Sequence, residues 1–240
     1  MEISQETIPN LKEKQFSLII TDPPYYDDAP YAELSEFFFV WYQRILSGLY
    51  PNNPNFNSAV TPKEGDLSVS HLRTGVEFGE KFIFMCQKLN SLLKPNGMLV
   101  MFFAHPKVST WNSVIRAFIE GNFHVTATWP VSTESKGIAN AKKKNSLLSS
   151  LIIIARKVSE QTGSHKKEYT WEEFAAEAKK RVHEEFARLS KEGFRKADLI
   201  TVALGICFEL LTDPLHRNNI IDSDNAIKFI EALTEKEKMK

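Results

Sequence analysis

The stretch Phe16-Ser17-Leu18-Ile19-Ile20-Thr21-Asp22-Pro23-Pro24-Tyr25 carries the strongest structural signal in the sequence. Its first six residues form a largely apolar run rich in β-branched side chains, which is typical of a strand buried on both faces of a parallel sheet. Two successive prolines cannot continue a strand inside a sheet, so the strand must end there. Asp22 therefore stands at the carboxyl end of a central strand, where open α/β sheets bind their ligands.

Helix-like and strand-like segments alternate downstream of this strand. Apolar residues recur with a helical period at residues 34–45, 78–93 and 108–119, and strand-like runs occupy residues 98–103, 123–129 and 151–155. Ser35 or a neighbour is a candidate cap for the first helix, and Lys94 to Gly97 should end the second. The aromatic run Phe37-Phe38-Phe39 is expected to lie mostly in the core. This order predicts an α/β fold, with an antiparallel last strand because a loop and no helix precedes it.

Composition changes near residue 158, which divides the chain into two expected parts. Residues 1–157 should form part of a wound α/β domain, and residues 158–240 a helical extension with helices around residues 171–186, 197–211 and 224–233. A loop of about 20 residues at Pro51 to Ser70 is long enough to be functional or disordered. A second loop, from Val131 to Ser150, contains Lys136, Lys142, Lys143 and Lys144.

The charge and cysteine content exclude several classes of protein. Lys plus Arg number 30 and Asp plus Glu number 30, so a surface that binds nucleic acid must be local. Two cysteines far apart, Cys86 and Cys207, indicate buried thiols rather than a disulfide scaffold or a cysteine zinc site, and no metal is expected. The first residues do not resemble a signal peptide, and no apolar run approaches the ~20 residues of a membrane span. We expect a cytoplasmic protein.

Asp22-Pro23-Pro24-Tyr25 resembles a signature of enzymes that methylate exocyclic amines, and the chemistry that this resemblance implies explains the residue types. The lone pair of such an amine is delocalised into the ring, so the nitrogen is a poor nucleophile. A carboxylate and the adjacent proline carbonyl can accept hydrogen bonds from both N–H groups, and proline fixes φ and leaves that carbonyl outward. The aromatic ring can then stack on a base taken out of the duplex. The alternative interpretation is a strand-ending turn with an incidental aspartate.

Asp22-Pro23-Pro24-Tyr25 resembles the signature of S-adenosylmethionine-dependent amino-methyltransferases, above all DNA adenine-N6 methyltransferases. The stretch from Tyr26 through Asp27-Asp28-Ala29-Pro30-Tyr31-Ala32 into an aromatic-rich helix is similar to adenine-specific DNA methylases of the DUF1156 type. Segments at residues 97–105, 125–131 and 197–205 are also similar to that family, so the likeness covers roughly residues 15–212. It implies a partial Rossmann-like methyltransferase sheet, mostly parallel, with a helical extension.

The resemblance also implies roles for single residues. Asp22, Pro23, Pro24 and Tyr25 would be catalytic, and Tyr26, His105 and Trp129 would lie near the substrate base. The four lysines Lys136, Lys142, Lys143 and Lys144 would contact DNA phosphates. Each has a plainer interpretation: a core or rim tryptophan, a histidine that stabilises a turn, and a solvated lysine loop. DNA is the expected partner, with RNA as an alternative.

The glycine-rich turn with which such enzymes hold S-adenosylmethionine is missing. None of the ten glycines are two residues apart, and too few residues precede the first strand for another strand–helix–strand unit. The chain therefore resembles the catalytic half of a methyltransferase. Either a partner chain supplies the cofactor-binding half, or the chain is a remnant or a truncated reading frame. The first strand would then be an edge strand that invites a partner. The alternative is a non-catalytic nucleic-acid-binding or partner subunit, or an inactive remnant.

Overall fold

A computed structural model describes residues 15–53, 56, 58–61, 63, 65–105, 107–132, 149–158, 169–191, 199–214, 216 and 223–238. The chain divides into two compact units. The larger unit comprises Met1–Pro23 and Phe82–Lys240 and contains the sheet. The smaller unit comprises Pro24–Lys81.

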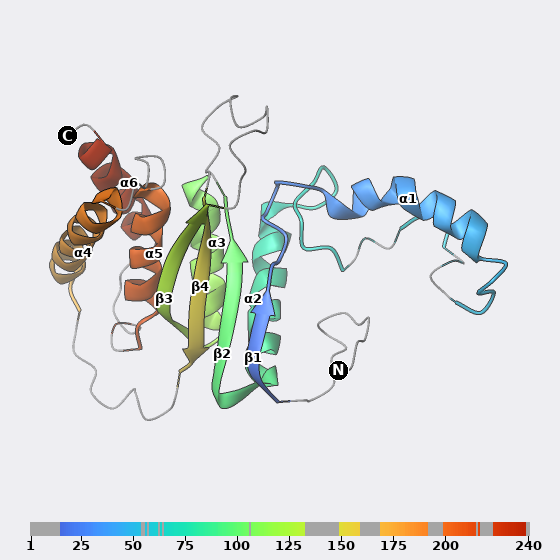
Figure 1. Ribbon diagram of the computed structural model, residues 1–240, viewed down its shortest axis with the longest axis horizontal. Coiled ribbons are helices and arrows are strands. Elements are labelled where there is room, and N and C mark those ends of the chain that lie inside the picture. Colours follow the sequence, from blue (N-terminus) through green and yellow to red (C-terminus); the bar gives the residue numbers. More distant parts are fainter. Residues whose placement is uncertain are drawn as a thin grey trace. The chain divides into compact units, whose positions relative to one another are not determined.

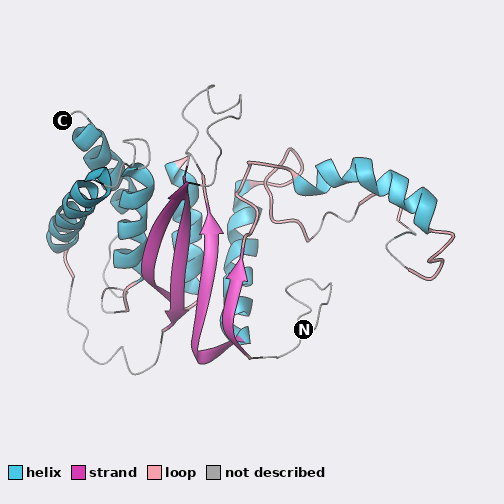
Figure 2. Cartoon of the chain, viewed as in Figure 1, coloured by secondary structure: helices cyan, strands magenta, loops and turns pink. Residues whose placement is uncertain are grey.

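The sheet of the larger unit has four strands in the order β1-β2-β4-β3 (Figures 1 and 2). These are β1 (Phe16–Thr21), β2 (Leu93–Phe103), β3 (Phe123–Ser132) and β4 (Ser149–Lys157). β1 pairs with β2 in parallel, and β4 is antiparallel to both β2 and β3, which confirms the antiparallel last strand. β1, β2 and β3 run in one direction, but β4 separates β2 from β3, so only one adjacent pair is parallel. The expectation of a mostly parallel sheet is correct for the strand directions and wrong for the pairings.

One face of the sheet is packed against helices. The ring of Phe103 on β2 lies 6.1 Å from that of Phe82 on α2 (Gly75–Leu92) and 5.1 Å from that of Trp111 on α3 (Val108–Glu120). α5 (Leu199–Thr212) packs on β3 so closely that a Cβ at Gly205 would lie 2.4 Å from Thr128 Oγ1. The side chains on this face are almost completely buried. They are Leu99, Met101 and Phe103 on β2, Phe123 and Val125 on β3, and Leu151, Ile153 and Ala155 on β4.

The opposite face of the same sheet is apolar and only partly buried. Leu18 is 46% exposed, Ile20 63% and Trp129 59%. The strand register places these three beside half-buried residues of the central strands, namely Met98, Val100 and Phe102 on β2 and Ile152 and Ile154 on β4. Figure 1 shows α2 and α3 behind the sheet and no described helix of this unit in front of it. Among the described strands β1 lies at the edge of the sheet, as expected for a chain without the cofactor-binding half. The expectation that it is buried on both faces is wrong, because one of its faces is open.

The helical tail belongs to the same compact unit as the sheet. α4 (Trp171–Lys191) packs on α5, and α6 (Ser223–Lys238) packs on α3 and α5, so these two helices form an outer layer. Thr212 Oγ1 on α5 accepts a hydrogen bond of 2.9 Å from the Val125 amide of β3, next to a bulge between Val125 and Ala127. The sheet and the helical tail therefore share one compact unit.

The smaller unit contains α1 (Tyr31–Leu46) and the long loop that follows it. Ser35 does not cap this helix: it lies in the first turn and donates to the Ala32 carbonyl at 2.8 Å. The Asp66 carboxylate instead accepts from the Ala32 amide at 2.9 Å. The aromatic run is not core, since Phe37 is 67% exposed and Phe38 60%. No helix in the described residues is long and apolar enough to cross a membrane.

Because Phe102 and Phe103 lie on opposite faces of the sheet, their replacement by alanine should reduce the free energy of unfolding by different amounts. Phe103→Ala should reduce the free energy of unfolding by about 3–5 kcal/mol, because it opens a cavity under α2 and α3. Phe102→Ala should cost roughly 1–2 kcal/mol, because that ring lies on the open face and keeps contact with water. Urea denaturation at low protein concentration measures both. Equal losses would mean that both faces are covered.

Candidate functional site

Asp22 and Pro23 directly follow β1, at the sheet edge where β1, β2 and β3 all end. The last paired residue of β1 is Thr21, opposite Met101, and the backbone leaves the ladder at the next residue. Asp22 is exposed and Pro23 is buried. Asp22 thus occupies a solvent-exposed position at this edge of the sheet. The sequence predicted correctly that Asp22 directly follows this strand.

His105 lies at the same edge, two residues after β2, and its side chain is buried. Its Nδ1 accepts a hydrogen bond from the Lys107 amide at 3.1 Å, and its carbonyl accepts one from Trp111 Nε1 at 3.1 Å. These bonds fix the turn between β2 and α3. The geometry supports the turn interpretation of His105, and its contact with substrate stays a prediction.

Trp129 lies on β3 opposite Ile152 and projects from the open face of the sheet. Its indole is neither a core side chain nor covered, at 59% exposed. The sequence predicted correctly that Trp129 lies in a strand. The predicted role of Trp129 beside a substrate base stays a prediction. In the strand order β1-β2-β4-β3 it lies three strands from Asp22, which is about 14 Å at a strand spacing of ~4.8 Å.

Pro24 and Tyr25 begin the smaller unit, in which Tyr26 is held in an unusual conformation. Its φ is +62°, a left-handed value that a residue with a side chain adopts only when its surroundings require it. The Tyr26 carbonyl accepts from the Val69 amide at 2.9 Å, and its ring meets Phe78 edge-on at 5.0 Å. A Cβ at Gly75 would lie 2.3 Å from the Tyr26 hydroxyl, so glycine makes room for it. The residue after Tyr25 is therefore fixed by packing.

A buried arginine organises the rest of this unit. Arg73 donates to both carboxylate oxygens of Glu33 at 3.0 and 2.7 Å, to Asp66 at 2.9 Å and to the Ser68 carbonyl at 2.8 Å. The hydrogen bond from Arg73 lowers the pKa of the Glu33 carboxyl to about 2. Sequence analysis missed this cluster, because Glu33 lies 40 residues before Arg73 and the members show no periodicity. The network ties the start of α1 to the loop that also holds Tyr26.

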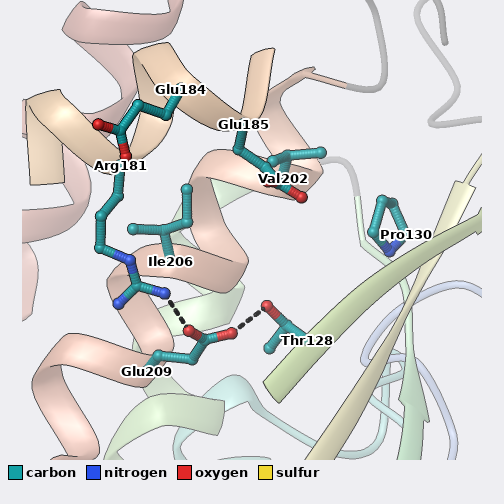
Figure 3. Close-up of a pocket in the computed structure, with 8 residues that line it drawn as sticks. All are labelled: Thr128, Pro130, Arg181, Glu184, Glu185, Val202, Ile206 and Glu209. Atoms are coloured by element: carbon teal, nitrogen blue, oxygen red, sulfur yellow. Dashed lines mark hydrogen bonds and ion pairs between the residues drawn. The ribbon is translucent and has the colours of Figure 1, made fainter. Parts of the chain in front are cut away.

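A small polar cavity of about 210 Å³ lies between β3, α4 and α5 (Figure 3). Glu209 is its central polar group: it accepts from Thr128 Oγ1 at 2.8 Å and pairs with Arg181. Glu184, Glu185, Val202 and Ile206 complete the lining with Pro130. The cavity is smaller than typical ligand pockets of about 300–1,000 Å³. Its polar groups serve to join the helical layers to the sheet.

The remaining predicted residues, Lys136, Lys142, Lys143 and Lys144, lie outside the described residues, so their phosphate contacts stay predictions. Among the described residues, no three His, Cys, Asp or Glu side chains are grouped to hold a metal ion. Both cysteines are free and buried, and burial raises the pKa of the Cys207 thiol to about 12. No family model, no curated protein and no solved structure matches this chain.

The Glu33–Arg73 contact predicts a specific dependence of stability on pH. Because the folded pKa of Glu33 lies below its unfolded value, its stabilising contribution is complete above about pH 4.5 and is lost as the pH falls toward about 2. Glu33→Gln should therefore be less stable than the native chain at pH 7. The difference in stability between the two should shrink as the pH falls through this range. Thermal unfolding across that range is the measurement.

Glu120→Gln is the matched control, since Glu120 forms an exposed pair with Arg116 on α3. Exposed pairs contribute little, so this variant should follow the native pH profile. A Glu33→Gln profile parallel to that of the native chain would contradict the role given to Arg73.

Proposed function

We propose that this chain is the catalytic-motif half of a DNA adenine-N6 methyltransferase. The observation that carries the proposal is the position of Asp22-Pro23 immediately after β1, at the edge where three strands of one direction end. Ligands of open α/β sheets bind at such an edge. The carboxylate is exposed there, as an acceptor for a substrate amine must be.

The proposed chemistry needs only acceptors and a ring face from this chain. The Asp22 carboxylate and the Pro23 carbonyl accept hydrogen bonds from the two N–H groups of the adenine amine, which orients its lone pair. Tyr25 stacks on the flipped base, and the packed Tyr26 behind it restricts the local backbone. Positioning of this kind is a major source of rate in group transfer. Lys136, Lys142, Lys143 and Lys144 are proposed contacts to DNA phosphates.

S-adenosylmethionine is the proposed methyl donor, but the residues of this chain do not fit it as a binding site. No two glycines are spaced as a Gly-x-Gly turn, so the backbone cannot approach a cofactor in the expected way. The cavity beside Glu209 is too small and lies beneath β3, away from Asp22. We therefore assign the cofactor to a half outside these 240 residues, such as a second chain.

The outer edge of β1 supports the assignment of the cofactor to a separate half. Among the described strands β1 pairs only with β2, so its other side can offer backbone groups to a further strand. An added strand would place its own end beside Asp22. The bound donor would then reach the amine from a neighbouring strand end.

A second candidate function is a nucleic-acid-binding or partner subunit without catalysis, or an inactive remnant. The absent glycine turn favours it, because a chain that never meets a donor would have no need for one. The two candidates differ in whether Asp22 recognises the amine of adenine.

Binding of the full chain to short single-stranded DNA tests this recognition. One probe carries adenine at a central position, and a second carries purine, which lacks the 6-amino group. The native chain should prefer adenine, and Asp22→Ala should abolish most of that preference, since hydrogen bonds to a charged group contribute about 1.5–3 kcal/mol. Tyr25→Ala should weaken the binding of both probes by about 1–3 kcal/mol, and Tyr25→Phe should retain most of the native affinity.

Asp213→Ala serves as the control, because Asp213 follows Thr212, which contacts Val125 near the start of β3, at the opposite end of the strands from Asp22. This variant should keep the adenine preference. A native chain that binds both probes equally, or an Asp22→Ala variant that still prefers adenine, would refute the assignment and favour the non-catalytic subunit.

A further inference from the structure

Tyr26 directly follows Tyr25, in a backbone conformation that is rare for a residue with a side chain. The Tyr25 carbonyl accepts from the Asp28 amide at 3.3 Å, which closes a four-residue turn with Tyr26 at its second position. The φ of Tyr26 is +62° and that of Asp27 is not positive, which is the pattern of a type II′ turn with glycine at this position. A tyrosine persists there only when its surroundings hold it.

Residues 69–78 of the same compact unit hold Tyr26 at three points. The Val69 amide donates to the Tyr26 carbonyl at 2.9 Å, and the Phe78 ring meets the Tyr26 ring edge-on at 5.0 Å. The third point is Gly75, where a Cβ would lie 2.3 Å from the Tyr26 hydroxyl oxygen. The φ of Gly75 lies outside the left-handed range, so this position requires a missing side chain and not a special backbone conformation.

Arg73 holds the Val69 amide in place. Val69 lies between Ser68, whose carbonyl accepts from Arg73 Nε at 2.8 Å, and Ser70, which exchanges backbone hydrogen bonds of 3.0 and 3.3 Å with Arg73. Arg73 is itself buried, so water competes little for these bonds. The residues on both sides of Val69 are therefore fixed, which orients its amide toward the Tyr26 carbonyl.

We propose that Gly75 and Val69 are positioning residues for Tyr25, and that they act through Tyr26. This inference rests on the proposed function, in which Tyr25 stacks on the target base. The Tyr25 carbonyl is bonded to Asp28 and the Tyr26 carbonyl to Val69, so the backbone that carries the Tyr25 ring is ordered before a base arrives. A binding residue whose backbone is already ordered loses less conformational entropy when its ligand binds.

Binding of the full chain to the adenine and purine probes tests the role of Gly75. Gly75→Ala should weaken the binding of both probes about fivefold or more, because the added Cβ displaces the Tyr26 ring and with it the backbone of Tyr25. The ratio of the two affinities should stay as in the native chain, because that ratio depends on Asp22, which belongs to the other compact unit.

Tyr26→Phe provides the matched background, because it removes the hydroxyl group that the added Cβ would meet. The next atom, ring carbon Cζ, lies 3.2 Å from that Cβ position, a contact that a shift of a few tenths of an ångström relieves. Gly75→Ala should therefore cost less than about twofold in affinity relative to Tyr26→Phe alone. Gly65→Ala is a second control and should keep the native affinity, because a Cβ at Gly65 has no atom within 4 Å.

Hydrogen exchange of the Val69 amide reports the same contact without nucleic acid. This amide should exchange slowly in the native chain, quickly in Gly75→Ala, and slowly again when Gly75→Ala is combined with Tyr26→Phe. If circular dichroism shows that Gly75→Ala does not fold, Tyr26→Gly takes its place. Glycine adopts the positive φ but lacks the ring, so Val69 exchange should accelerate and both probes should bind more weakly.

The outcomes separate this inference from the proposed function. A native chain that binds neither probe, or a Tyr25→Ala variant that binds both as tightly as the native chain, would overturn the two together. If Tyr25→Ala weakens binding but Gly75→Ala costs the same in both backgrounds, or costs nothing, only the positioning role is overturned. Native-like exchange of the Val69 amide in the variant that folds would overturn that role as well.

Discussion

The packing of helices on a single face of the sheet is the constraint on which the rest of this structure depends. α2 and α3 cover Phe103 of β2, α5 packs on β3 and β4, and α4 and α6 add a layer behind them. The fully buried side chains of the described sheet therefore lie on one face. The other face and the outer edge of β1 are more exposed, and the proposed cofactor half would pair along that edge.

The proposed function starts from Asp22, which is exposed and directly follows β1 at the edge of the described sheet. A strand added in parallel along that edge would end beside it. In the smaller unit, Tyr26 is held by contacts with Val69 and Phe78, and Arg73 pairs with Glu33. In the function proposed above, Asp22 recognises a substrate group and the cofactor is held by another half.

Much of the fold could be predicted from the sequence because its signals are local. The period of apolar residues located the helices and strands, and the loop before β4 predicted its antiparallel direction. Burial of β1 could not be predicted, since the apolar run of Leu18 to Ile20 is the same whether a neighbour is present or not. The Arg73 cluster and the cap at Asp66 depend on contacts between distant residues, which leave no periodic pattern. The Asp22-Pro23 turn was predictable because proline ends a strand by its own geometry.

Native-state hydrogen exchange, resolved for each amide, tests the central claim that the strand leading to Asp22 is a free edge. Amides of β2 and β4 should exchange slowly, because these strands have partners on both sides. Along β1, slow and fast amides should alternate, since only every second N–H faces β2. Uniform protection from Phe16 to Thr21 in the isolated monomer would contradict the account, because it would mean that another strand already pairs with β1.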